Sequence, residues 1–165
     1  MATVTSELIK ELRERTGAGM LDCKKALLET EANLDDAIDW LRKKGLSAAA
    51  KKSGRTATEG TITIEISADN KKATISEINC ETDFVGQNEN FIEFCASTTS
   101  HIHTNGVKNV DDLLASTINE SLFSDHLSIT IGKIGENIVV RRFAEVSVGE
   151  NGSVNVYKHA NGKIG

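Results

Sequence analysis

The chain has 165 residues and a formal net charge of −5, and its 39% hydrophobic and 26% charged residues are the balance of an ordinary globular protein, which argues against wholesale disorder. No apolar run approaches the roughly 18 residues that a membrane-spanning helix needs, and the first residues contain no apolar stretch of the kind found in a secretory signal. Three widely spaced cysteines, Cys23, Cys80 and Cys95, do not form a disulfide framework, so we expect a soluble, cytoplasmic protein without membrane contact.

Residues 1–45 have the pattern of three short helices. Thr5 can cap the first helix, and residues 16–19 end it with two glycines. Asn33 can cap the third helix, which we expect to end at Gly45. The apolar residues expected to face inward repeat at helical spacing: Leu8, Ile9, Leu12, Met20, Cys23, Ala26, Leu27, Leu34, Ala37, Ile38 and Leu41. The pattern predicts a small three-helix bundle of the ubiquitin-associated type, which is typical of a docking module.

Residues 46–59 lack a sustained apolar stripe, and we interpret them as a basic linker that is partly helical. Residues 42–55 contain six Lys and Arg and no acid. The favoured interpretation of this basic cluster is a solvated helix end and linker, with an RNA contact or a surface for an acidic protein as alternatives. Residues 1–55 carry 11 Lys and Arg against 9 Asp and Glu, whereas residues 56–165 carry 8 against 15. The acidic remainder disfavours a nucleic-acid-binding domain.

The period of the apolar pattern changes to two after residue 60. Ile62, Ile64 and Ile66 alternate with polar residues and predict a half-buried strand, and residues 69–72 predict a turn to a second strand at 73–79. Four side chains of a helix at 88–102 are expected to be buried: Phe91, Ile92, Phe94 and Cys95. The remaining predicted elements are helices at 110–114 and 125–132 and strands at 138–148 and 153–157. Helices packed on an antiparallel sheet give an α+β fold class.

No arrangement of residues indicates catalysis or metal binding. His101 and His103 would point about 200° apart on a helix and could not share a metal ion, so we expect both to be solvated. Cys80 and Cys95 lack the spacing of a metal or redox motif and are interpreted as core residues. The sequence contains no phosphate-binding glycine loop in the required context. It therefore predicts a protein that is not an enzyme and has no cofactor and no metal.

The segment 79–85, with the sequence NCETDFV, ends a predicted strand. Thr82 can cap the turn that follows, which leaves Asp83 and Phe84 near its tip. Phe84 is either a core residue beneath the sheet or an exposed side chain that enters a pocket of a partner.

Four stretches of the sequence, at residues 8–20, 22–27, 79–85 and 133–142, closely resemble bacterial elongation factor Ts. They span almost the whole chain in the order that the family has. The resemblance implies a ubiquitin-associated-like bundle at 1–45, the linker at 46–59 and the first half of an α+β core at 60–150. It further implies that residues 151–165 begin a second half that is cut short.

The resemblance also implies a function. Members of this family are nucleotide exchange factors for the GTPase elongation factor Tu, and they release its GDP during translation elongation by perturbing the site that holds the phosphates and Mg²⁺. Such a protein has elongation factor Tu as its partner and needs no direct contact with nucleic acid. The residues that match family contact positions are Arg13, Met20, Leu21, Lys24, Thr82, Asp83, Phe84, Val85, Ile134, Gly135 and His159. Asp83 and Phe84 match the pair that intrudes into the GTPase near its Mg²⁺ site.

Two other functions remain open at this stage. The basic cluster at 42–55 and the Gly-Lys-Ile-Gly sequence at 132–135 could form an RNA-binding module, because a GxxG loop clamps RNA in some domains. We interpret residues 132–135 more simply as a tight turn between a helix and a strand. The bundle alone would also fit a docking protein without exchange activity.

Overall fold

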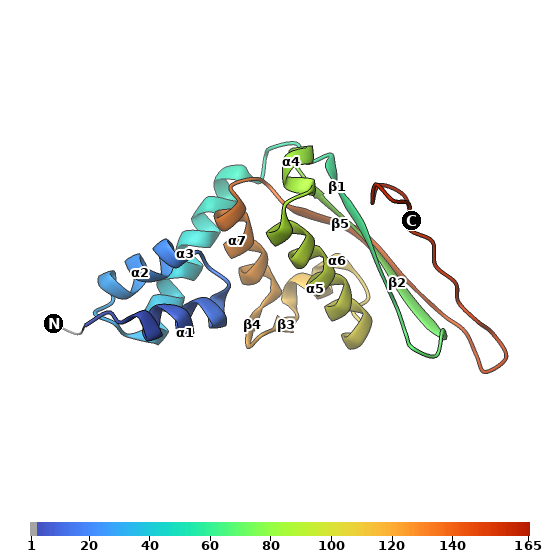
Figure 1. The fold of residues 1–165 in the computed structure, drawn as a ribbon, viewed down its shortest axis with the longest axis horizontal. Helices are drawn as coiled ribbons and strands as arrows, with labels where there is room; N and C mark the ends of the chain where they lie inside the picture. The colour runs from blue at the N-terminus through green and yellow to red at the C-terminus, as the bar shows by residue number, and fades with distance from the viewer. Residues whose placement is uncertain (1–2) are drawn as a thin grey trace. The chain divides into compact units, whose positions relative to one another are not determined.

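The computed structural model describes residues 3–165, which form two compact units (Figure 1). Unit 1 consists of the chain up to Gly54 together with Thr117–Gly135, and unit 2 consists of Arg55–Ser116 and Glu136–Gly165. Unit 2 contains helices and an antiparallel sheet, so the predicted α+β fold class is confirmed. Within residues 3–165 no helix combines the length and the apolar character required to cross a membrane.

The first and third helices of unit 1 begin directly after the predicted caps, Thr5 and Asn33. Its elements are α1 (Ser6–Thr16), α2 (Met20–Glu29), α3 (Leu34–Lys52), β3 (Thr117–Ile118), β4 (Ser121–Leu122) and α7 (Phe123–Ile134). The Thr5 hydroxyl accepts a hydrogen bond from the backbone N–H of Leu8, and the Asn33 side chain caps α3 in the same way. The buried core contains Leu12, Ala18, Cys23, Ala26, Leu27, Ala37 and Leu41. Met20, expected in this core, is 59% exposed.

The third helix is longer than predicted. The expected end at Gly45 is wrong, because α3 continues to Lys52 and includes half of the expected linker. Gly45 is buried and lies against α7: a Cβ atom at this position would be 3.1 Å from the backbone of Ile129. This glycine allows a close approach of two helices and does not end one. The structure thus places α7 beside α3 (Figure 1), although the sequence assigned its residues to the second domain.

Unit 2 is built on a three-stranded antiparallel sheet in the order β1-β2-β5. Its strands are β1 (Glu59–Ile66), β2 (Lys72–Cys80) and β5 (Val139–Ser147), and its helices are α4 (Asp83–Gly86), α5 (Glu89–Asn105) and α6 (Val110–Ala115). Ile78, Phe91, Phe94 and Ile102 are buried between the sheet and α5. Ile92, expected to be buried with them, is 49% exposed. It directly follows the buried Phe91, and successive positions on a helix point in different directions.

The C-terminal residues differ from the prediction. Residues 153–157 form no strand. The chain instead reaches β1 at a later turn, where the backbone N–H of Ile62 donates to the carbonyl of Gly162 over 2.7 Å. A single backbone hydrogen bond of this kind satisfies part of the edge of β1 without extending the sheet.

The two histidines of α5 are half-buried and hydrogen-bonded, so the prediction that both are solvated is wrong. His101 Nε2 lies 2.8 Å from the hydroxyl of Ser116, and His103 Nδ1 lies 2.9 Å from the hydroxyl of Thr74. Burial lowers the pKa of His101. The two rings therefore connect α5 to different neighbours. No group of three His, Cys, Asp or Glu side chains able to hold a metal ion occurs among residues 3–165.

The cysteines are buried and free, as predicted. Burial raises the pKa of the Cys80 thiol to about 11 and also raises the pKa of Cys95. Because the thiolate is the reactive form, we expect a thiol reagent at pH 8 to label the native protein far more slowly than the protein in denaturant. Absorbance of the released chromophore measures both rates. Native labelling as fast as in denaturant would contradict the burial of these thiols.

Candidate partner-binding surfaces

The most exposed aromatic ring in unit 2 belongs to α4, the short helix that follows β2. Phe84 is 83% exposed, and its neighbour Asp83 is also exposed. The alternative that Phe84 is a core residue is therefore wrong. Thr82 caps α4 as predicted, with its hydroxyl accepting from the backbone N–H of Val85 over 3.3 Å. The turn presents an apolar ring and an acid side by side to solvent.

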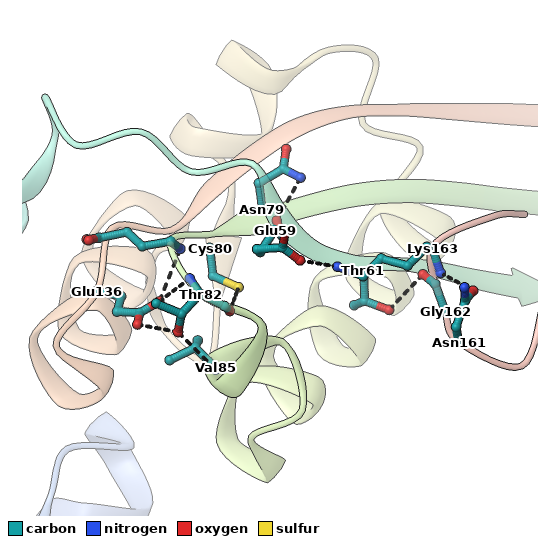
Figure 2. A network of polar contacts seen from close by, with 11 residues as sticks. Glu59, Thr61, Asn79, Cys80, Thr82, Val85, Glu136, Asn161, Gly162 and Lys163 are labelled. Carbon is teal, nitrogen blue, oxygen red and sulfur yellow. Dashed lines mark hydrogen bonds and ion pairs between the residues drawn. The ribbon is translucent and has the colours of Figure 1, made fainter.

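A carboxylate from a distant part of the chain holds the start of this turn. Glu136 Oε2 accepts the backbone N–H groups of Glu81, at 3.1 Å, and Thr82, at 3.0 Å. Its other oxygen accepts the Thr82 hydroxyl at 2.6 Å (Figure 2). Sequence reasoning missed Glu136, because its partners are more than 50 residues away and no local pattern connects them.

The segment that contains Glu81 also binds the segment that contains Glu136. Glu81 Oε1 accepts the backbone N–H of Asn137 at 2.6 Å and lies 3.5 Å from a guanidinium nitrogen of Arg55. The side chain of Asn137, which is buried, donates to the Arg55 carbonyl at 2.8 Å. We refer to the five residues Arg55, Glu81, Thr82, Glu136 and Asn137 as the carboxylate bracket. Arg55, interpreted from the sequence as a solvated linker residue, belongs to it.

A hollow of about 930 Å³ lies beside α4, between Phe84 and the C-terminal turn that carries Asn161 and Lys163. The Lys163 ammonium pairs with the Glu59 carboxylate at its edge (Figure 2). His159 precedes this turn. Its ring is exposed, and its Nδ1 atom lies 2.7 Å from the hydroxyl of Tyr157. A partner that contacts the ring of Phe84 therefore meets a recess with both polar and apolar walls.

Unit 1 has an exposed apolar stripe of its own on α2. Met20 is 59% exposed and Leu21 is 83% exposed, and Lys24 lies one turn further along the helix. Leu28, which sequence reasoning did not single out, is 60% exposed and continues the stripe at helical spacing. Arg13 is exposed on α1. Solvent-exposed leucine and methionine in one stripe are typical of a protein-binding surface.

The segment 132–135 is the end of a helix. Gly132 lies within α7, Ile134 is its last residue and is half-buried, and Gly135 caps it with φ 90°. The backbone N–H of Gly135 donates to the carbonyl of Ile131 at 2.9 Å. The expected tight turn at 132–135 is wrong, because residues 132–134 continue α7 and only Gly135 leaves the helix.

Comparisons with known proteins agree on one family. The family model described as elongation factor TS matches residues 81–165. Elongation factor Ts of Nautilia profundicola is 50% identical over 165 residues, which cover 100% of this chain and 54% of the relative. The protein of the same name from Campylobacter concisus is 50% identical over 162 residues, 98% of this chain and 46% of the relative. Elongation factor Ts of Clostridium novyi is 51% identical over 165 residues, which cover 98% of this chain and 54% of the relative. The chain spans about half the length of the curated relatives it matches.

Proposed function

The chain belongs to the elongation factor Ts family, and we propose that it is a guanine nucleotide exchange factor for elongation factor Tu. In this role it acts in the cytoplasm during translation elongation, binds the GTPase and promotes release of GDP. The observation that carries the proposal is the 83% exposed ring of Phe84 in a segment that matches the family's contact motif.

Exchange of this kind follows from thermodynamic linkage. A protein that binds the nucleotide-free GTPase more tightly than the GDP-bound form must weaken GDP binding by the same factor. Each 1.4 kcal/mol of difference changes the affinity about tenfold. The factor needs no cofactor and makes or breaks no covalent bond. Its contacts alone supply the difference.

We propose that Phe84 and Asp83 supply that difference, with Thr82 and Val85 as their support. An apolar ring inserted between helices of the GTPase domain shifts them, and an acid beside it disturbs the ligands of the bound Mg²⁺. Its exposure makes the ring available for this insertion.

The other proposed contacts provide affinity and orientation. On unit 1 they are Arg13, Met20, Leu21, Lys24, Ile134 and Gly135, and on unit 2 His159. The exposure of Met20 and Leu21 supports the assignment of α2, because apolar side chains buried on binding are frequent hot spots.

Release of a fluorescent GDP analogue from elongation factor Tu tests the proposed function. We expect the chain to accelerate release in proportion to its concentration. Binding to the GTPase without acceleration would instead support a docking protein. A lack of both, with salt-dependent RNA binding, would support the RNA-binding alternative.

The basic cluster gives little support to that alternative. Arg42 and Lys43 lie 3.3 Å and 3.8 Å from carboxylate oxygens of Asp39, and Lys44 pairs with Asp22 at 2.5 Å. Arg55 also lies 3.5 Å from a Glu81 carboxylate oxygen. Four of the six basic residues thus have acidic neighbours, which reduces the attraction of the cluster for phosphate.

Lys51 and Lys52, at the end of α3, are expected to contribute little to exchange. Replacement of both with glutamine should change the stimulated rate of GDP release less than about tenfold, because charges outside a contact alter association only modestly. Arg55 is left unchanged in this variant because it belongs to the carboxylate bracket. A larger loss at constant ionic strength would make the end of α3 part of the contact.

A further inference from the structure

We propose that Glu136 is a positioning residue for nucleotide exchange, whose carboxylate fixes α4 so that Phe84 is presented to the GTPase. The inference rests on the proposed function. Glu136 acts through Thr82, its hydrogen-bond partner, and does not itself contact the GTPase.

The need for such a residue follows from the weakness of α4 as an isolated element. None of its four residues is buried, and Phe84, which would ordinarily anchor such a turn, is exposed. A single helical turn is unstable by itself, because several backbone angles are fixed for one hydrogen bond. Polar contacts at the N-terminal end of α4 therefore add to its packing against β1 and β2 in fixing its orientation.

Glu136 supplies these contacts with both carboxylate oxygens. One oxygen accepts the backbone N–H groups of Glu81 and Thr82, and the other accepts the Thr82 hydroxyl proton (Figure 2). The oxygen of that hydroxyl in turn accepts the N–H of Val85 and caps α4. Hydrogen bonds to an ionised carboxylate are stronger than those between neutral groups. One side chain thus fixes both the end of β2 and the first turn of α4.

The rest of the carboxylate bracket holds Glu136 itself. The Glu81 carboxylate accepts the N–H of Asn137, the residue next to Glu136. The Arg55 guanidinium lies 3.5 Å from the same carboxylate and offsets the repulsion between two neighbouring acids. The two segments therefore fix each other: two backbone N–H groups donate to the Glu136 carboxylate, and one donates to the Glu81 carboxylate.

A fixed orientation of α4 in the free protein favours nucleotide exchange. A contact element that is already fixed loses little conformational freedom when it binds, and this preserves affinity. Without the Glu136 carboxylate, α4 becomes ordered only when it binds the GTPase. The free energy spent on that ordering reduces the preference for the nucleotide-free GTPase, and GDP binding is then weakened less.

The test measures the second-order rate constant of stimulated GDP release from elongation factor Tu. Glu136→Ala should lower it about tenfold or more. Glu136→Gln should stay within about threefold of the parent, because its amide oxygen can still accept the two backbone N–H groups. In a Phe84→Ala background, Glu136→Ala should have less than about a twofold effect, because the residues act as one unit. Equal losses in both backgrounds, or no loss, would overturn the inference.

Two further measurements separate positioning from general stability. In the free protein, Glu136→Ala should accelerate amide hydrogen exchange at Thr82 and Val85 while the amides of β1 keep their protection. Ser76→Ala is the matched control, since it removes a buried hydrogen bond to Thr99 away from α4. It should lower the melting temperature without affecting GDP release. Unchanged protection at Thr82 overturns the inference, whereas a parent protein that does not stimulate GDP release overturns the proposed function.

Discussion

Replacement of Phe84 by alanine is expected to leave the melting temperature within a few degrees of the parent and to lower the stimulation of GDP release about tenfold or more. The ring is 83% exposed, so its removal takes little apolar surface out of the fold. Removal from a contact with the GTPase would cost the hydrophobic free energy of burying it there, about 1.5 to 3 kcal/mol. A melting curve and a GDP release rate on the same preparation measure both effects.

Phe91→Ala provides the comparison for this prediction. Phe91 is fully buried in unit 2, and truncation of a buried phenylalanine costs about 3 to 5 kcal/mol. Its melting temperature should fall sharply. If Phe84→Ala melted as low as Phe91→Ala, the ring would have a structural role. If GDP release remained fully stimulated by a well-folded Phe84→Ala protein, the proposed contact would be wrong.

Gly60→Ala is expected to be among the most destabilising single substitutions in unit 2, with a loss of about 3 kcal/mol or more. Gly60 has φ 128° in β1, and a Cβ atom there would lie 2.1 Å from the carbonyl oxygen of Ile78 and 2.7 Å from the Cα of Asn79. These are backbone atoms of the paired strand β2. They cannot move aside without breaking the register of β1 and β2.

Gly106→Ala is the matched control for this substitution. Gly106 also has a positive φ, of 62°, but no atom lies within 4 Å of its Cβ position. The strain of the left-handed conformation alone costs about 1 to 2 kcal/mol. Urea denaturation of both variants gives the two losses. Equal values would mean that the backbone contact at Gly60 adds nothing to the strain.

Local chemistry explains which parts of the fold could be predicted. The starts of α1 and α3 depend on Thr5 and Asn33, whose side chains bond to backbone groups two or three residues away. The hairpin of β1 and β2 is indicated by the alternation within β1 and by the turn residues at 69–72. The cap at Thr82 is equally local, and it places Phe84 near the tip of the turn.

Contacts between distant residues explain what could not be predicted. Gly45 resembles a helix end in sequence, and only Ile129 of α7 shows that it is a packing position. Nothing in the local sequence distinguishes Glu136 from a surface acid, and only its hydrogen bonds to Glu81 and Thr82 show its role. The exposure of Met20 likewise depends on how α2 packs, because the sequence spacing places it on the inward stripe.

The pairing of α3 with α7 also constrains how the protein is made. Gly45 and Ile129 are far apart in the sequence, and the whole of Arg55–Ser116 lies between the two stretches that form unit 1. During synthesis the first three helices emerge long before α7. The second half of α3 therefore cannot pack against α7 until the β1–β2 hairpin and α5 have been synthesised. Closing so long a loop carries an entropic cost. Unit 1 is therefore completed late, and a fragment ending at Gly54 would lack the helix that covers this half of α3.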